Sequence, residues 1–254
     1  GLTTLTIPTN VIEMGQSVFA SNVTGNINYG NCWDAGKYNI CWQCGGGSLK
    51  QLTFTKGAKL KRLPQYAFMG QDKLESVTWA NGLDTIGNHS MAYCTSLINR
   101  QFPEDLKLIE EFAFRSCTSL DTIVLPPHLE TIESYAFEGC QNMDVIKISS
   151  SVRNINNYAF TGCPNVSRVY TYTAEPTNIL QQTFDCYKVA DLYVPRTSYM
   201  KYFYNTQWSQ FVKLIEFDEA YDYFYLNGDY ELGGEHGTIE GNPDVDINPG
   251  GGLI

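Results

Sequence analysis

The sequence lacks the features that assign a chain to several common functional classes. No apolar run reaches 18 residues, so no segment has the length and composition of a transmembrane helix. Only three histidines are present, and no Ser–His–Asp order, nucleophile elbow, phosphate-binding glycine loop or metal-ligand cluster occurs. We therefore expect neither an enzyme nor a protein with a cofactor or a bound metal.

Basic charge is missing from one part of the chain. Residues 216–254 hold ten acidic residues and no Lys or Arg, whereas the whole chain has a net charge of −10. The rest of the chain is therefore neutral overall, which argues against nucleic-acid binding. The acidic segment is predicted to be a linker or a disordered tail. Asp244 and Asp246 resemble the start of a calcium loop, but Pro249 stands where that loop requires glycine.

The sequence does contain a repeat of 23 residues. Cys94, Cys117, Cys140, Cys163 and Cys186 are each separated from the next by 23 residues, and leucine, isoleucine and phenylalanine recur in phase with them. One unit reads C-x-x-L-x-x-I-x-L-P-x-x-L-x-x-I-x-x-x-A-F-x-x-C. A period of this length is typical of a solenoid of leucine-rich type.

Each part of the unit predicts a local structure. The segment "LDTIVLP" alternates like a strand and ends at Pro126, which has no N–H for a ladder. "HLETI" supplies a second short inward pair, and "SYAFEGC" is predicted to be a short helical turn with Phe137 and Cys140 inward. Because one turn cannot bury this face alone, the turns must stack. The predicted fold is a β-rich α/β repeat solenoid, a horseshoe with a concave parallel sheet and short helical turns.

The five repeat cysteines allow three interpretations: free thiols, disulfides or metal ligands. Equivalent positions in neighbouring turns lie about 5 Å apart at the spacing of paired strands. Cysteine is commonly buried as a small apolar residue, and stacking is natural at that distance. We therefore expect five buried free thiols.

An insertion at about residues 20–47 interrupts the repeat. Insertions in solenoids leave as loops on one face, which is often the binding face. Cys32 and Cys41 are predicted to form a local disulfide in an oxidising compartment, with Cys44 as the displaced repeat cysteine. "CWQC" does not predict redox activity, because three glycines follow where a helix should begin. Four aromatic residues either pin this loop to the solenoid or stack on a ligand: Tyr29, Trp33, Tyr38 and Trp42.

The outward face of the predicted sheet is a second candidate surface. Solenoids use such extended faces to bind proteins or polymers, although an ordinary solvated face is the alternative. The face is mildly polar at its N-terminal end and basic and aromatic at its C-terminal end. The residues predicted to lie on it are Thr53, Thr78, Asn99, Gln101, Thr122, Val124, Lys147, Arg168, Tyr170 and Tyr172.

Three regions are predicted along the chain: a solenoid over residues 1–195, a helical cap over residues 196–215, and the acidic segment over residues 216–254. An amphipathic helix is expected to begin at Ser198. Because an open solenoid end would expose strand edges, the cap aromatics are interpreted as packing residues. They are Tyr199, Tyr202, Phe203 and Trp208.

The units "LDTIVLPPHLETIESYAFEGC" and "VIKISSSVRNINNYAFTGC" resemble the BspA-like leucine-rich repeats of bacterial surface and secreted proteins. The segment "LYVPRTSYMKYFYNTQWSQF" resembles the closing segment of that family. The resemblance covers about residues 1–215. It implies a right-handed horseshoe, export from a Bacteroidetes-type bacterium to the cell surface or beyond, and adhesion to host or microbial macromolecules. It transfers no shared binding residues. The chain opens within a repeat, so a signal segment is expected upstream.

Three non-enzymatic functions stay open. The first is a surface adhesion scaffold that recognises host or microbial proteins through the concave face. The second is a glycan-binding module that uses Trp33 and Trp42, and the third is a passive spacer. The expected partner is an extracellular protein or glycan.

Overall fold

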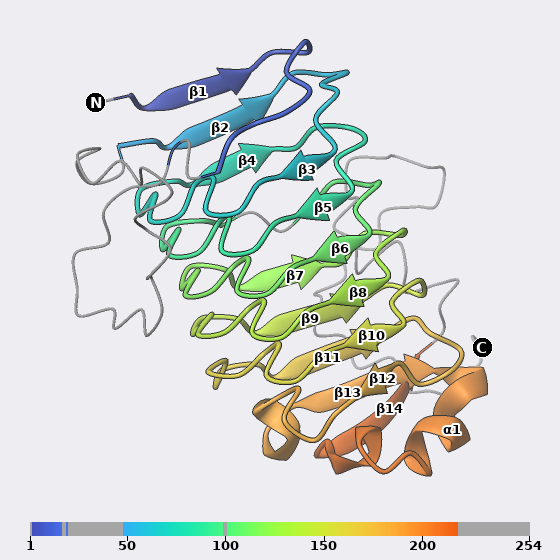
Figure 1. The fold of residues 1–254 in the computed structure, drawn as a ribbon. Helices are drawn as coiled ribbons and strands as arrows, with labels where there is room; N and C mark the ends of the chain where they lie inside the picture. The colour runs from blue at the N-terminus through green and yellow to red at the C-terminus, as the bar shows by residue number, and fades with distance from the viewer. Residues whose placement is uncertain (1, 17–18, 20–47, 99–100, 218–254) are drawn as a thin grey trace, which may run out of the picture.

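The computed structural model describes residues 2–16, 19, 48–98 and 101–217. Several predictions lie outside these residues: the insertion with its disulfide and aromatic side chains, Asn99, and the acidic segment from residue 218 onward. Figure 1 shows the described part as a stack of turns that runs from β1 near the N-terminus to β14 and α1 at the other end.

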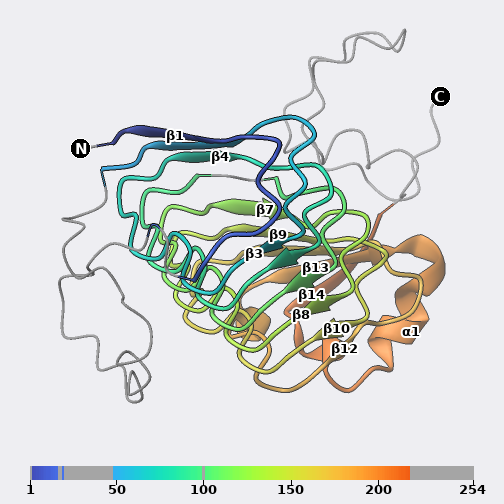
Figure 2. The ribbon, with the colours of Figure 1, turned by 45° about the horizontal axis from the view of Figure 1, so that its top comes forward.

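Most turns place a strand on a first face of the stack (Figures 1 and 2), and within the described residues this row of strands is interrupted between β4 and β7. These strands form one three-stranded and one five-stranded parallel sheet, in the orders β1-β2-β4 and β14-β13-β11-β9-β7. Their bounds are β1 (Thr4–Ile7), β2 (Gln51–Phe54), β4 (Ser76–Thr78), β7 (Thr122–Val124), β9 (Val145–Ile148), β11 (Arg168–Thr171), β13 (Asp191–Pro195) and β14 (Lys213–Phe217).

The second face carries one further parallel sheet, here called the second sheet, which is built from the "HLETI" segments and their equivalents. It has six strands in the order β12-β10-β8-β6-β5-β3. Their bounds are β3 (Arg62–Leu63), β5 (Thr85–Ile86), β6 (Leu108–Ile109), β8 (Thr131–Ile132), β10 (Asn154–Ile155) and β12 (Asn178–Ile179).

From β3 to β10 on one face, and from β7 to β13 on the other, the register follows the 23-residue repeat. Thr131 pairs with Leu108 on one side and with Asn154 on the other, so the partners stand 23 residues apart. Val145 pairs with Thr122 and with Arg168 at the same separation. The predicted parallel-sheet repeat solenoid is therefore confirmed.

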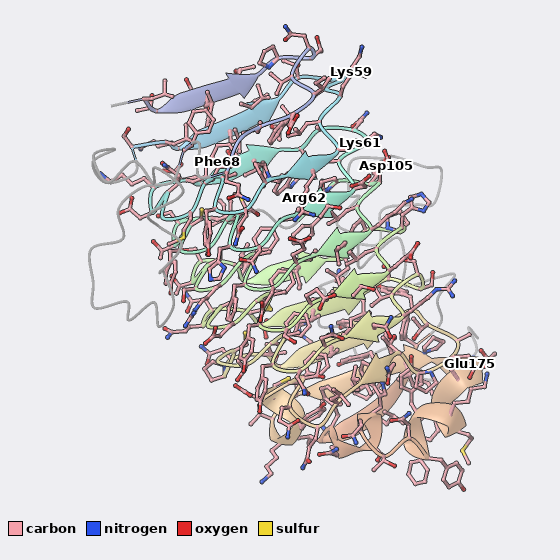
Figure 3. All side chains as sticks on the ribbon, viewed as in Figure 1. Lys59, Lys61, Arg62, Phe68, Asp105 and Glu175 are labelled. Carbon is pink, nitrogen blue, oxygen red and sulfur yellow. The ribbon has the colours of Figure 1, made fainter. Side chains whose placement is uncertain are left out.

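Figure 3 draws the side chains on the stack; the core lies between its two strand faces, where equivalent inward side chains recur in successive turns. Phe114, Phe137, Phe160 and Phe184 form a continuous stack, with ring centroids 5.3, 5.2 and 5.0 Å apart. The inward leucine and isoleucine residues of the second sheet, such as Leu129 and Ile132, are fully buried. Each turn therefore completes the core of its neighbours.

The repeat cysteines form a second internal ladder, and all five are buried and free. The Cys117 thiol donates to the Met91 carbonyl over 3.2 Å, and Cys140 donates to the Phe114 carbonyl over 3.3 Å. Burial raises the pKa of Cys117 to about 12, so this thiol stays protonated and unreactive. The prediction of buried free thiols is confirmed. No cluster suited to a metal is found in the described part of the chain.

The "SYAFEGC" segments are chains of turns rather than the short helical pieces expected. Residues in these segments adopt left-handed backbone conformations, with φ of 59° at Tyr135 and 74° at Gly139. Their N–H groups alternate between two acceptors: Glu138 donates to Tyr135 O in its own turn, and Phe137 donates to Ala159 O in the next turn. In an α-helix each N–H bonds to a carbonyl four residues earlier in the same segment. Here some of these N–H groups bond to the next solenoid turn instead, so a helix does not form.

The C-terminal cap closes the core with two buried aromatic residues. Trp208 and Tyr202 have no exposed surface. The Trp208 indole donates to the Thr177 carbonyl over 2.7 Å, and the Tyr202 hydroxyl lies 2.9 Å from the Thr171 hydroxyl. The predicted packing is seen for these two residues and for Tyr199, which is partly buried against the same core, whereas Phe203 is 51% exposed.

The cap helix predicted to begin at Ser198 is short. Helix α1 spans only Tyr199–Phe203, and the chain returns to pair β14 with β13 through Phe217. None of the helices that the structure describes has the length and apolarity needed to cross a membrane. The remaining helical pieces are the 3-10 segments Cys186–Lys188, Arg196–Ser198 and Trp208–Gln210.

The phenylalanine stack predicts a large stability effect at its centre. Phe137→Ala should lower the free energy of unfolding by about 3–5 kcal/mol, because it leaves a cavity against two stacked rings. Urea denaturation followed by far-UV circular dichroism measures this. Tyr204→Ala, at a side chain that is 75% exposed, is the matched control and should cost less than about 0.5 kcal/mol. Equal losses in the two variants would contradict the stacked core.

Candidate binding surface

The outward side of the first-face strands, here called the sheet face, is polar and small over its N-terminal half. Thr78 and Gln101 are exposed, and Thr53 and Thr122 are half-buried. Trp79 packs beside this region, where its indole donates to the Gln101 carbonyl over 2.9 Å. On the outward positions that the structure describes, this half offers hydroxyl and amide groups, and Trp79 is engaged with Gln101 and Phe54.

The middle of the sheet face is more closed than the sequence pattern indicates. Val124, Lys147 and Tyr170 form one row across β7, β9 and β11. Lys147 and Tyr170 alternate with buried core residues as predicted, yet only 8% and 7% of their surfaces are exposed. Large side chains in a neighbouring row can cover the aliphatic part of a lysine. Alternation along a strand therefore predicts on which side of the sheet a side chain lies, but not how much of its surface is exposed.

A charged pair lies at the edge of this row. The Arg168 guanidinium is 3.0 Å from the Asp144 carboxylate, and both side chains are partly exposed. An exposed pair of this kind contributes little to stability, about 0–1 kcal/mol. It does hold the Arg168 side chain in place beside the aromatic residues of β11.

The C-terminal end of the sheet face carries an aromatic cluster, defined as Tyr170, Tyr172, Tyr193 and Phe217. Tyr170 stacks on Tyr193 with ring centroids 4.3 Å apart. Phe217 meets Tyr172 edge-on at 5.3 Å and Tyr170 at 6.1 Å. Three strands therefore contribute to one aromatic surface next to Arg168.

Two members of this cluster were absent from the predicted site. Tyr193 stands 23 residues after Tyr170, so the repeat length alone would have found it. Phe217 lies in β14, within the segment that the sequence assigned to the acidic tail. The sequence pattern contained no signal for that strand, because its pairing with β13 begins after the repeat has ended.

A second aromatic row runs along the turns, on a different side of the stack. Tyr66, His89, Phe112, Tyr135 and Tyr158 follow one another with centroid distances of 5.1, 4.7, 4.9 and 5.0 Å. Their ring faces contact each other, so only their edges remain outward. This row therefore suits packing between turns better than stacking on a ligand.

His89 is the one imidazole in this row. Burial, and secondarily the nearby Arg115 guanidinium, lower its pKa from 6.5 to about 4. Its Nδ1 lies 2.6 Å from the Asn88 amide oxygen, which can only accept, so the proton of the neutral ring sits on Nδ1. His89 thus serves as a neutral packing residue at physiological pH.

Comparison with known families identifies the repeat. The family model described as "BspA type Leucine rich repeat region (6 copies)" matches residues 38–167 and 108–227, which together span more than half of the chain. The chain belongs to this family. No curated protein matches this chain.

Solved structures similar to this BspA-type chain show the same fold. A leucine-rich repeat protein of T. pallidum is 22% identical, with a TM-score of 0.50, and the match covers 69% of this chain and 72% of that one. The pneumococcal vaccine antigen PcpA is 16% identical, with a TM-score of 0.58, over 85% of this chain and 56% of that one. The match thus spans little more than half of the pneumococcal chain.

The low pKa of His89 predicts a pH dependence of stability. Between about pH 6.5 and 4 the unfolded chain binds a proton that the folded chain excludes. The contribution of this ring is therefore complete above pH 6.5 and falls as the pH drops, by about 2 kcal/mol at pH 4.5. In His89→Phe, which keeps a ring between Tyr66 and Phe112, this part of the loss should disappear.

Urea midpoints measured at pH 7 and pH 4.5 test this prediction. His128→Gln, at an exposed histidine, is the control and should retain the wild-type difference between the two pH values. If His89→Phe also retained that difference, the proposed role of the neutral ring would be wrong.

Proposed function

We propose that this BspA-type chain is a non-enzymatic binding scaffold at the cell surface that recognises a host or microbial protein through its sheet face. The observation that carries the proposal is the aromatic cluster beside Arg168. Tyrosine and arginine are the residues most enriched at the energetically dominant positions of protein interfaces. Tyr172, Tyr193 and Arg168 are each partly exposed, so a partner can reach them.

The shape of the sheet face also favours a macromolecular partner. Five paired strands at about 4.8 Å spacing extend over about 20 Å, a length suited to a protein surface or an extended polymer. The polar N-terminal half would then form the rim of the contact, and the aromatic cluster its anchor. A contact of this kind requires no cofactor, metal or catalytic group.

A surface location agrees with the family and with one solved relative. That relative, the pneumococcal protein PcpA, is described as a vaccine antigen. For the present chain we propose display outside the cell, where the five repeat thiols escape oxidation because they are buried. An extracellular protein is accordingly the proposed partner.

A binding screen against extracellular-matrix proteins, microbial surface proteins and glycans tests this function. For any partner found, Arg168→Ala combined with Tyr172→Ala should weaken binding by about 10-fold to 100-fold, since these residues would be interface anchors. Thr78→Ala, at the other end of the same face, is the matched control and should change the affinity by less than about twofold. Circular dichroism confirms that each variant is folded.

A second variant separates the alternatives. Trp33→Ala combined with Trp42→Ala removes the two tryptophans of the insertion, which lie outside the described residues. Loss of glycan binding in this variant alone would favour a glycan-binding module. The absence of any partner in the whole screen would favour a passive spacer, and either result would overturn the sheet-face proposal.

A further inference from the structure

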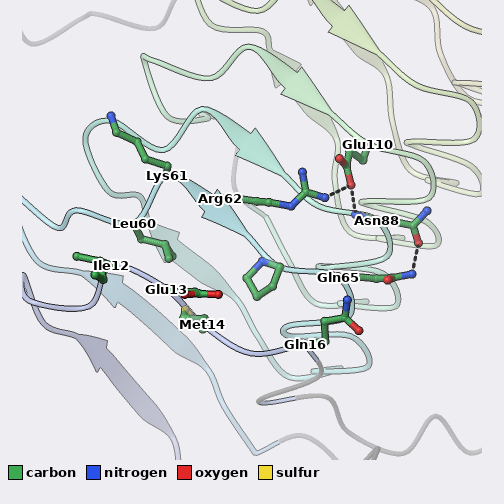
Figure 4. A pocket seen from close by; sticks show the side chains of 11 residues that line it. Ile12, Glu13, Met14, Gln16, Leu60, Lys61, Arg62, Gln65, Asn88 and Glu110 are labelled. Atoms are coloured by element: carbon green, nitrogen blue, oxygen red, sulfur yellow. Dashed lines mark hydrogen bonds and ion pairs between the residues drawn. The ribbon is translucent and has the colours of Figure 1, made fainter. Parts of the chain in front are cut away.

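A groove of about 420 Å³ opens on the second-sheet side, between the first turn and β3 (Figure 4). It lies away from the sheet face, on the opposite sheet of the solenoid. One wall is the segment 12–16 and the other is β3 with its flanking residues. The lining residues are Ile12, Glu13, Met14, Gln16, Leu60, Lys61, Arg62, Pro64, Gln65, Asn88 and Glu110.

The groove exists because, among the described residues, the first turn is hydrogen-bonded to the second turn only near its two ends. At one end β1 pairs with β2. At the other end Phe19 N donates to Ala67 O over 2.8 Å, and the Phe19 ring stacks on Phe68 at 5.2 Å. Between these attachments, no hydrogen bond within the described residues joins segment 12–16 to β3.

Pro64 explains the missing pairing. In the following turns the residue at this position donates its N–H to the preceding turn: Gly87 to Leu63 O, Glu110 to Ile86 O and Glu133 to Ile109 O, each over 2.9 Å. Proline has no N–H, so the second turn cannot make this bond to the first. β3 is consequently an edge strand of its sheet.

The main chain of Arg62 is left facing the groove. In the next turn the equivalent residue, Thr85, pairs with Arg62 and donates its N–H back toward Lys61 O. By the same register, the Arg62 N–H points toward the first turn, where no described hydrogen bond uses it. An edge with an unused donor is a template for an added extended segment.

Two acidic and two basic side chains line the groove, so its electrostatic character depends on where each charge stands. The Arg62 guanidinium is neutralised by Glu110 at 2.5 Å, and the same carboxylate accepts the Asn88 N–H over 2.9 Å. Figure 4 shows Lys61 extending away from Glu13, toward the next turn. Glu13 is exposed and has no ion pair within the part of the chain that the structure describes. The Glu13 carboxylate, with the Lys61 ammonium turned away from it, therefore stands beside the accessible apolar side chains of Ile12 and Met14.

We propose that this groove binds an extended peptide segment that carries a lysine or arginine. The peptide main chain would bond to the Arg62 edge, as in recognition by strand addition. Its basic side chain would pair with Glu13, and a neighbouring apolar side chain would cover Ile12 and Met14. This site is independent of the sheet face, so the failure of either proposal leaves the other intact.

Fluorescence anisotropy on the whole chain tests the site with two labelled peptides. Both are six-residue Val/Thr peptides, one with a central lysine and the other with a central glutamate in its place. The lysine peptide should bind, and Glu13→Lys should weaken its binding by about fivefold to tenfold. Glu104→Lys, an exposed acidic residue outside the groove, is the matched control and should leave the affinity unchanged. Equal affinities for the two peptides, no binding of either, or equal effects of the two substitutions would overturn the proposal.

A second variant tests the main-chain part of the proposal. Pro64→Ala restores the missing N–H, so the first turn can pair with β3 and close the groove. Peptide binding should be lost while the melting temperature is kept or raised. Retained peptide binding in Pro64→Ala would overturn the strand-addition mode. Self-association that competes with the peptide would assign the groove to a second copy of this chain and would also overturn the proposal.

Discussion

Hydrogen bonding between equivalent residues of successive turns is the constraint on which the rest of the structure depends. Each second-sheet strand is only two residues long and could not persist alone, yet β8 pairs on both sides with strands of the same register. The same bonding converts the "SYAFEGC" segments into turns with left-handed residues. Once this register is set, identical side chains meet their own copies, and the phenylalanine and cysteine ladders follow.

The repetition also determines how such a protein can acquire a binding surface. Side chains at the same position of successive repeat units line up as a row along the solenoid. The chemical character of a surface therefore changes when a few members of its row are substituted. On the sheet face the row passes from Val124 through Lys147 to Tyr170 and then to the stacked Tyr193. On the opposite sheet a single proline at position 64 interrupts the bonding and opens a groove. Both candidate sites are departures from the repeat, supported by regular turns on at least one side.

The sequence predicted most of the fold, because the 23-residue period is visible in several residue types at once. It predicted the inward residues, the free state of the repeat cysteines and the buried Trp208. It did not predict the turn conformation at Tyr135, since the competing hydrogen bonds come from the next turn rather than from neighbours in sequence. The small exposure of Lys147 and the strand that ends at Phe217 also depend on contacts between turns, which alternation within one segment does not encode.

The most direct test of this account removes one complete turn. Deletion of residues 118–140 takes out 23 residues and leaves every remaining turn in register, whereas deletion of residues 118–137 takes out 20 and breaks the register. The account predicts that the first variant folds, with a native-like circular dichroism spectrum and a single cooperative thermal transition at lower temperature. The second variant should lose cooperative unfolding. Equal behaviour of the two deletions would contradict the claim that bonding between equivalent residues of successive turns holds this protein together.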